Sequence, residues 1–245
     1  MTYAIIDADS IYFRAAYVTK KTNEIRKIVR ETMLDIEAQT WAEKMLVAVK
    51  GRGNFRKDLY PEYKKNRKDL EPDMKKALTY AHEFMVGEYD AKPADGMEAD
   101  DLVSIWAYET REQEIPYCVV GIDKDLKQIP GNHYNFKRKE HVFMDDDASN
   151  LSLMQQCITG DSTDNIPGVK GLGPVKAGKL LAGISQDRRW NRVRAVWRAN
   201  SAGCPKLSRR LLEMLTSWEE FDGIKAECEA IIGKQDVLQE QKQDS

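Results

Sequence analysis

Short apolar segments alternate with helical patterns along the first half of the chain. The apolar segments are TYAIIDA at 2–8, MLVAV at 45–49 and PYCVVGI at 116–122, and helical patterns cover 23–44, 73–88 and 97–111. Strands that alternate with helices favour an α/β fold with a mostly parallel sheet. Ligands of such sheets bind outside the carboxyl ends of the strands. The residues that follow each apolar segment are therefore the first place to search for a site.

Acidic residues form four clusters where an apolar segment ends or a loop begins. The clusters IIDAD, MEADD, GIDKD and GDSTDN contain Asp7, Asp9, Glu98, Asp100, Asp101, Asp123, Asp125, Asp161 and Asp164. Carboxylates gathered from distant parts of a chain repel one another unless cations neutralise them. Oxygen ligands without a Cys/His cluster indicate Mg²⁺ or Mn²⁺ rather than zinc. The pattern predicts a metal-dependent, phosphate-cleaving site, although the dipole of the helix at 97–111 also explains the acids at its start.

The net charge of −2 conceals a strong segregation of charge. From Lys50 to Lys76 there are ten Lys/Arg and five Asp/Glu, and from Ser185 to Arg210 eight Lys/Arg and one Asp. From Leu211 to the end, nine acids outnumber three bases. Basic blocks beside an acidic site would hold a phosphate backbone while the acids hold metal. Solvated helix faces are the alternative explanation for either block.

Composition excludes several classes of protein. Of 245 residues 42% are hydrophobic, which suffices for a core, and no apolar run is long enough to span a bilayer. The chain begins almost at once with a strand pattern, so we expect no signal peptide. Cys118, Cys157, Cys204 and Cys228 lack CxxC spacing. We therefore expect reduced thiols, a cytoplasmic location and no membrane partner.

The segment 51–73 and the last hundred residues differ from the alternating region. The segment holds glycines, prolines and many charges, and we expect it to be exposed, mobile and ordered by a polyanion. Helical patterns at 148–159, from Pro174, at 186–199 and at 205–218 predict a helical region. The final dozen residues are expected to be frayed or disordered. These features predict domains at 1–150 and 151–218, followed by an acidic segment at 219–245.

A glycine-rich turn lies between two of the predicted helices. Gly168, Gly171 and Gly173 let backbone N–H groups approach a phosphate, and Lys170 and Lys176 flank them. Such a turn would grip a DNA backbone without reading bases. The sequence GPVKAGK at 173–179 imitates a phosphate-binding loop, but Leu180 replaces the Ser/Thr that binds Mg²⁺, and no strand immediately precedes it.

From Thr2 to about Leu181 the chain resembles the flap endonuclease/5′→3′ exonuclease family, particularly its bacteriophage members. The resemblance rests on YPEYKKNRK (60–68), EADD (98–101), GIDKDLKQI (121–129) and GDSTDNIPGVKGLGPVKA (160–177) in this order. It implies a PIN-like 5′-nuclease fold, with a helical arch at 51–76 and a helix–three-turn–helix DNA clamp at 160–182. It also implies Mg²⁺-dependent cleavage near the 5′ end of duplex or flap DNA, which leaves a 5′-phosphate.

The resemblance assigns roles to individual residues. Two ions, Mg²⁺ or Mn²⁺, would be held by a first group, Asp7, Glu98, Asp100 and Asp101, and a second, Asp123, Asp125, Asp161 and Asp164. Lys64 and Arg67 would be the catalytic basic pair of the arch. The DNA-binding set would be Phe13, Arg14, Arg56, Lys65, Gly168, Lys170, Gly171, Gly173 and Lys176. A K⁺ ion at the clamp, RNA/DNA hybrids as further substrates and a monomeric enzyme are compatible with the family.

One position departs from the family pattern. The family usually has an Asp just after the second strand, followed by an aromatic–Arg pair, which Phe55 and Arg56 match. The place of the acid falls at Val49 or Gly51, and neither side chain binds a metal. Asp9 could substitute in part, although we expect it to be a helix N-cap. The first metal site is therefore expected to be weaker or more hydrated than is usual.

Two other functions are compatible with these residues. A toxin-like, metal-dependent RNase would share the acidic cluster but usually lacks the glycine-rich clamp. A DNA-structure-binding protein that has lost efficient metal use would explain the absent acid. Cleavage of 5′-flap DNA and of single-stranded RNA would distinguish them.

Overall fold

The computed structural model describes residues 1–229, and its centre is a six-stranded sheet in the order β3-β2-β1-β4-β5-β6. Among the strands of the described residues, only β6 is antiparallel to its neighbour. The strands are β1 Tyr3–Asp7, β2 Lys44–Lys50, β3 Lys92–Ala94, β4 Tyr117–Val120, β5 Gly131–Asn135 and β6 Glu140–Met144. The mostly parallel sheet confirms the predicted class, and β1, β2 and β4 fall on the three apolar segments.

Helices follow most of the predicted ranges. They are α1 Asp9–Val18, α2 Thr22–Thr40, α3 Phe55–Leu59, α4 Pro72–Tyr89, α5 Ala99–Glu112, the 3₁₀ turn η1 Asp125–Gln128, α6 Asp146–Thr159, α7 Pro174–Leu181, α8 Gln186–Ala199 and α9 Pro205–Leu212. Residues 218–229 are also helical. α1 was not among the predicted helical ranges, although the expected N-cap role of Asp9 implied a helix there, and α9 ends six residues before the predicted end at 218.

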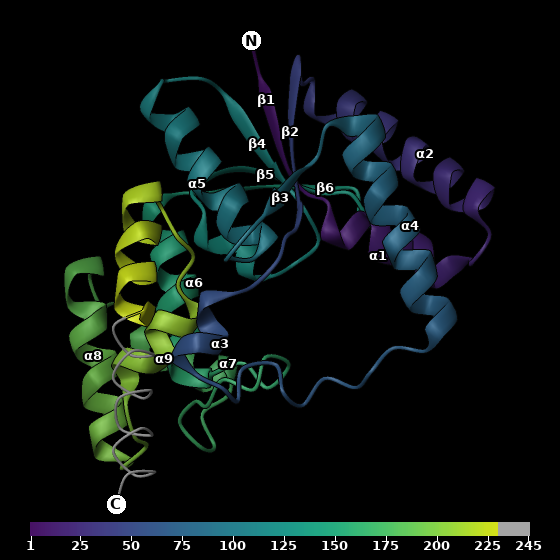
Figure 1. Ribbon diagram of the computed structural model, residues 1–245. Helices are drawn as coiled ribbons and strands as arrows, with labels where there is room; N and C mark the ends of the chain where they lie inside the picture. Colours follow the sequence, from purple (N-terminus) through teal and green to yellow (C-terminus); the bar gives the residue numbers. More distant parts are fainter. Residues whose placement is uncertain (230–245) are drawn as a thin grey trace, which may run out of the picture.

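Helices cover both faces of the sheet (Figure 1). On one face Ile6, Val47 and Val120 pack in one core with residues of α1, α2 and α4. On the other face Ile5 and Val119 pack in a second core with α5. Successive residues of a strand point to opposite faces, so the fully apolar strands bury both of their sides. This burial fixes the register of β1, β2 and β4, and with it the positions of the acids at their ends.

Helices α6 to α9 form a separate helical lobe around a third core (Figure 1). Trp197 is buried in this core, and its Nε1 donates a hydrogen bond to the Cys157 carbonyl at 2.7 Å. α7 starts at Pro174, directly after Gly173. The imitation of a phosphate-binding loop at 173–179 is thus mostly helix, in agreement with the sequence argument against that motif.

The C-terminal residues return from the lobe to the sheet domain. Phe221, Ile224 and Cys228 are buried in the core on the α5 face. A Cβ on Gly96 would lie 2.8 Å from Cζ of Phe221, so the helix packs directly on this glycine. The described part of the acidic segment predicted at 219–245 therefore belongs to the sheet domain. The predicted frayed end lies outside the described residues.

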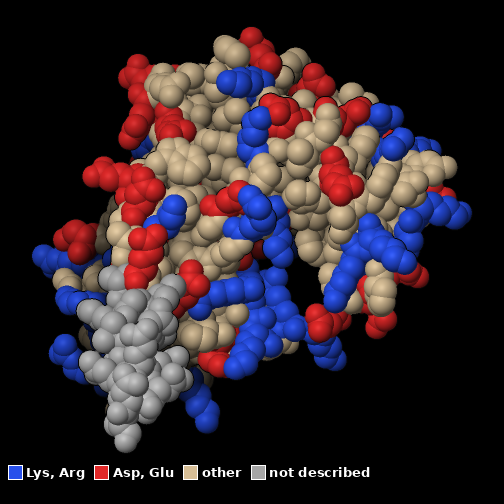
Figure 2. All heavy atoms as spheres, in the orientation of Figure 1, with Lys and Arg blue, Asp and Glu red and all other residues tan. Residues whose placement is uncertain are grey.

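The segment predicted as an arch, 51–76, contains α3 and the start of α4. Between them, residues 60–71 form a turn and an extended stretch. In Figure 2 the surface is hollowed between the region of α3 and α7 and that of α4, and Lys and Arg side chains border the hollow on both sides.

All four cysteines are free. No helix within residues 1–229 has the length and apolarity to cross a bilayer.

Candidate active site

Asp7 and Asp123 lie at the same edge of the sheet because their strands are neighbours. Asp7 is the last residue of β1, and Asp123 follows β4, which pairs with β1 in parallel. The pKa of the buried Asp7 carboxyl is raised by its removal from water and further by the charges of Asp9 and Asp123. A cation at this edge would relieve that repulsion.

Glu98 and Asp100 stand at the N-terminus of α5. Glu98 is the N-cap, and it forms a capping box with Asp101, in which each side chain accepts a hydrogen bond from the backbone of the other. Glu98 and Asp100 line a narrow cavity together with Asp125 and Asp164. This cavity therefore joins members of both predicted acidic groups.

Asp101 does not face the cavity, and its place in the predicted metal set is corrected. Both of its oxygens are bound by the guanidinium of Arg56, at 2.5 and 2.8 Å, and Asp101 is fully buried. Arg56 is only 3% exposed and lines the cavity, so its guanidinium lies inside the protein, and its predicted DNA contact stays a prediction. Removing one partner of a buried ion pair costs about 3–5 kcal/mol. Both residues therefore belong to the internal framework of the site.

The predicted catalytic pair of the arch contacts acids that line the cavity. Nζ of Lys64 binds Glu98 and lies 3.4 Å from Oδ2 of Asp164. Nη2 of Arg67 lies 2.5 Å from Oδ1 of Asp164. The Tyr63 hydroxyl, which the sequence analysis missed, donates to Glu98 at 2.8 Å and lies 3.2 Å from Asp164. The arch thus places two cations and a hydroxyl on carboxylates of both groups.

A further basic residue, Lys124, bridges two acids of the second group. Its Nζ lies 2.6 Å from Oδ2 of Asp161 and 3.2 Å from Oδ1 of Asp125. Burial opposes ionisation of Asp161, but the hydrogen bond and charge of Lys124 outweigh it and lower the pKa of Asp161. The position of Lys124 between two acids in GIDKD is a signal that could have identified it from the sequence.

The carboxylates in the cavity differ in their electrostatic environment. Burial and then the charge of Glu98 raise the pKa of Asp100 well above its ordinary value. Burial, followed by the charge of Asp123, raises the pKa of Asp125 to about 6. Burial would also raise the pKa of Glu98, but Lys64 and Arg56 outweigh it and lower this pKa. Burial outweighs the nearby cations at Asp100 and Asp125, whereas Lys64 and Arg56 outweigh burial at Glu98.

The donor set fits Mg²⁺ or Mn²⁺, because it consists of carboxylate oxygens. Among the residues that the structure describes, no three Asp, Glu, His or Cys side chains are close enough to form a metal-binding group. The ammonium groups of Lys64 and Lys124 lie between the carboxylates. A divalent ion would have to take the place of these ammonium groups.

The position of the absent family acid is apolar and closely packed. Val49 is fully buried in the core between the sheet and α1, α2 and α4. A Cβ on Gly51 would lie 2.3 Å from the Ala94 carbonyl carbon, so this position admits only glycine. Asp9 lies within α1 and caps no helix, contrary to expectation. Its Oδ1 accepts the Lys50 N–H at 2.7 Å, which places this carboxylate at the end of β2.

Most of the predicted DNA-binding residues are accessible. Arg14, Lys65, Lys170, Gly171, Gly173 and Lys176 are exposed, and Phe13 is half-buried. A Cβ on Gly168 would lie 2.1 Å from the Thr159 carbonyl carbon, and Gly171 has a φ of +79°. Backbone geometry therefore requires glycine at these two positions, whereas Gly173 has open space and a negative φ.

Several known proteins are similar to this chain. The flap endonuclease Xni of Shewanella putrefaciens (strain CN-32) is 30% identical over 141 residues, 52% of each chain. DNA polymerase I of Rhizobium leguminosarum is 27% identical over 206 residues, which are 72% of this chain and 20% of the polymerase. The chain thus spans about half of the first relative and a fifth of the second.

Solved structures from bacteriophage T5 share the fold. The T5 5′-exonuclease with bound zinc has a TM-score of 0.69 and 17% identity, over 94% of this chain and 99% of that chain. The T5 flap endonuclease in a pseudo-enzyme–product complex with DNA and metal ions has a TM-score of 0.66 and 19% identity, over 100% of this chain and 97% of that chain. Residues 2–153 match the family described as 5′-3′ exonuclease, N-terminal resolvase-like domain, and the chain belongs to this family.

Proposed function

We propose that this chain is a structure-specific, divalent-metal-dependent 5′→3′ exonuclease and flap endonuclease. It would cleave phosphodiester bonds near the 5′ end of duplex or flap DNA and leave 5′-phosphates. The observation that carries the proposal is the contact of Lys64 and Arg67 with acids of both groups around one cavity. Basic side chains that can move from carboxylates to a phosphate suit a site for an anionic substrate.

Mg²⁺ or Mn²⁺ is the proposed cofactor, with two ions. Asp7, Glu98 and Asp100 would hold the first ion, and Asp123, Asp125, Asp161 and Asp164 the second. Such ions lower the pKa of bound water and neutralise the leaving oxygen of a phosphodiester. Zinc in the T5 5′-exonuclease supports a divalent site in this fold. Asp101 is left out of this set because Arg56 engages both of its oxygens.

The chain's own residues would bind and orient the DNA. Arg67 can bind a phosphate through two N–H groups, whereas Lys64 acts as a point charge. The exposed turn with Lys170, Gly171 and Lys176 would hold the duplex backbone, because none of these groups reads a base. We therefore propose selectivity for structure and polarity rather than sequence. K⁺ at this turn is a prediction, tested by comparing DNA affinity in K⁺ and Na⁺.

The decisive assay compares three substrates in Mg²⁺, Mn²⁺ and EDTA: a 5′-flap duplex, a 3′-flap duplex and single-stranded RNA. The proposal expects cleavage of the 5′ flap alone among the DNA substrates, with 5′-phosphate products and no cleavage in EDTA. Preferential cleavage of RNA would favour a toxin-like RNase instead.

A DNA-structure-binding protein without efficient cleavage is the second candidate. The observation that favours it is Val49, an apolar side chain at the place where the family usually has an acid. Tight binding of the 5′ flap, with no cleavage at high Mg²⁺ or Mn²⁺, would establish this function.

A further inference from the structure

Residues 211–215, which we call the return segment, connect the helical lobe to the sheet domain. The segment begins at the end of α9, where the last carbonyls of a helix lack partners within the helix. The Leu211 carbonyl accepts a hydrogen bond from Nε of Arg56 at 2.8 Å. The Leu212 carbonyl accepts one from Nε2 of Gln128 at 2.9 Å. Side chains of the sheet domain thus cap α9, which lies beside α3 in Figure 1.

Arg56 connects the return segment to the first acidic group. Its Nη2 donates to the Glu213 carbonyl at 3.1 Å, while the guanidinium binds both oxygens of Asp101. Asp101 in turn accepts the Leu215 N–H at 3.2 Å and the Glu98 N–H at 3.0 Å. The backbone position of Glu98 at the cavity is therefore tied to the return segment through two buried side chains.

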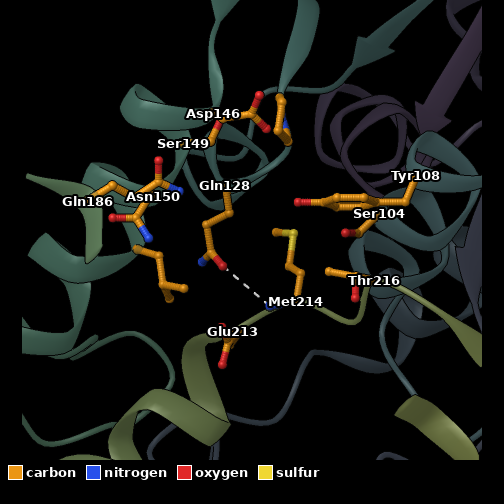
Figure 3. Close-up of a pocket in the computed structure, with 12 residues that line it drawn as sticks. Ser104, Tyr108, Gln128, Asp146, Ser149, Asn150, Gln186, Glu213, Met214 and Thr216 are labelled. Atoms are coloured by element: carbon orange, nitrogen blue, oxygen red, sulfur yellow. Dashed lines mark hydrogen bonds between the residues drawn. The ribbon is translucent and has the colours of Figure 1, made fainter. Parts of the chain in front are cut away.

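Gln128 connects the same segment to the second acidic group. Its Oε1 accepts the Met214 N–H at 3.3 Å, the hydrogen bond that is dashed in Figure 3. Its Nε2 also donates to Oε1 of Gln156 at 2.7 Å. The Nε2 of Gln156 then donates to Oδ1 of Asp125. A short chain of amide hydrogen bonds thus links the return segment to a carboxylate of the cavity.

We propose that the return segment positions the two acidic groups relative to each other, through Arg56 and Gln128. The segment lies outside residues 2–153, which match the family. It uses five consecutive residues, each with a backbone group bound to Arg56, Asp101 or Gln128. Arg56 and Gln128 are positioning residues, because they act through acids and do not touch the substrate. The inference rests on the proposed nuclease function.

Two variants of the full chain test this role. Gln128→Met keeps the length of the side chain and removes its hydrogen bonds. Arg56→Lys keeps the charge and removes the bidentate contact with Asp101. Arg111→Ala is the matched control. Arg111 lies on α5, the helix of Asp101, and also binds a carboxylate bidentately, that of Asp146 at 2.7 and 2.8 Å, but it has no hydrogen bond to the return segment. Thermal unfolding identifies the variants that are folded at the assay temperature.

The measurements are the Mg²⁺ half-saturation of 5′-flap cleavage, kcat, Mn²⁺ affinity by calorimetry and DNA affinity in EDTA. Outer contacts of metal ligands typically change affinity or activity about 10- to 100-fold. We expect kcat and Mn²⁺ affinity to fall by factors in this range in Gln128→Met and Arg56→Lys, while DNA affinity stays at the wild-type value. In the Arg111→Ala control, all of these values should equal those of wild type.

The proposal is overturned if folded Gln128→Met retains wild-type kcat, Mg²⁺ half-saturation and Mn²⁺ affinity. A lower melting temperature alone, with these three values unchanged, would assign the segment a purely structural role. Gln128→Met tests the positioning role even if Arg56→Lys does not fold. The Gln128 side chain is only partly buried, so we expect this variant to fold. Wild-type protein that cleaves no DNA would refute the nuclease function, whereas the Mn²⁺ measurement would still test the positioning.

Discussion

Nη2 of Arg67 lies 2.5 Å from Oδ1 of Asp164, so the arch and the glycine-rich turn are in direct contact. The backbone strengthens this contact, since the Lys64 N–H donates to the Asp164 carbonyl at 2.9 Å. Asn66 also donates to the Ser162 carbonyl at 2.7 Å. The expected mobile arch is thus docked on the turn, and its basic residues share carboxylates that we assign to metal.

Lys64→Ala should slow cleavage and at the same time tighten metal binding. Removing one group that stabilises a transition-state charge costs about 100-fold in kcat. The same change frees Glu98 and Asp164 from a competing cation, so Mn²⁺ should bind more tightly in calorimetry.

Lys65→Ala is the control for this prediction. Lys65 is exposed and, within residues 1–229, pairs only with Glu62, at 2.7 Å, so its loss should weaken DNA binding without changing kcat at saturating DNA. If Lys64→Ala also affected only DNA affinity, Lys64 would be a backbone contact rather than a catalytic residue.

Asp9→Asn should raise the Mg²⁺ requirement if Asp9 replaces the absent acid. Asparagine keeps an oxygen that can accept the Lys50 N–H, so the end of β2 should remain in place. The Mg²⁺ concentration that gives half-maximal cleavage should rise about tenfold. Gly51→Asp is not a usable test, because a Cβ there would overlap the Ala94 backbone. An unchanged Mg²⁺ titration would show that Asp9 takes no part in metal binding.

Asp125→Asn should stabilise the metal-free protein at pH 7.5 more than at pH 4.5. The folded pKa of Asp125, about 6, lies above the ordinary value of 3.8. Its contribution to stability is therefore present below pH 3.8 and is lost as the pH rises through about 6. The gain should be on the order of 1–3 kcal/mol, or about 2–4 °C in melting temperature for each kcal/mol.

Thermal melts of wild type and variant at the two pH values, with EDTA, provide the measurement. Mg²⁺ should then stabilise wild type more than the variant, because it neutralises the same charge. A difference in melting temperature that did not vary with pH would refute the assignment of the raised pKa.

Gly168→Ala and Gly173→Ala should separate the packing of the turn from its DNA contact. Gly168→Ala forces a Cβ against the Thr159 backbone and should cost roughly 1–3 kcal/mol of stability. Gly173→Ala meets no atom and should change stability by less than about 0.5 kcal/mol. If DNA approaches this exposed turn, Gly173→Ala should still weaken DNA binding. Unchanged DNA affinity in Gly173→Ala would place the duplex elsewhere.

The sequence predicted the sheet and the edge that carries the acids, because both depend on local patterns. An apolar strand followed by an acid defines the position of Asp7 and Asp123 without knowledge of the rest of the fold. The glycine-rich turn was equally local, since Gly168 and Gly171 are required by backbone geometry.

Arg56, Asp101 and the return segment could not be assigned from the sequence. Arg56 belongs to a basic block and Asp101 to an acidic one, and their spacing contains no sign that they bury each other. The return segment acts through backbone groups, which have no side-chain signature. Its hydrogen bonds with Gln128 join residues that are more than eighty positions apart in the chain, and no local sequence pattern indicates such contacts.

Cleavage of a labelled 5′-flap duplex by wild type and Asp123→Asn, with DNA binding in EDTA on the same preparations, tests the central claim most directly. The account predicts that wild type cleaves only with a divalent ion and leaves a 5′-phosphate. Asp123→Asn should lose most of this activity, because it removes a proposed metal ligand whose negative charge acts on both Asp7 and Asp125. DNA affinity should stay nearly intact. Normal turnover by Asp123→Asn, or cleavage by wild type in EDTA, would contradict the account.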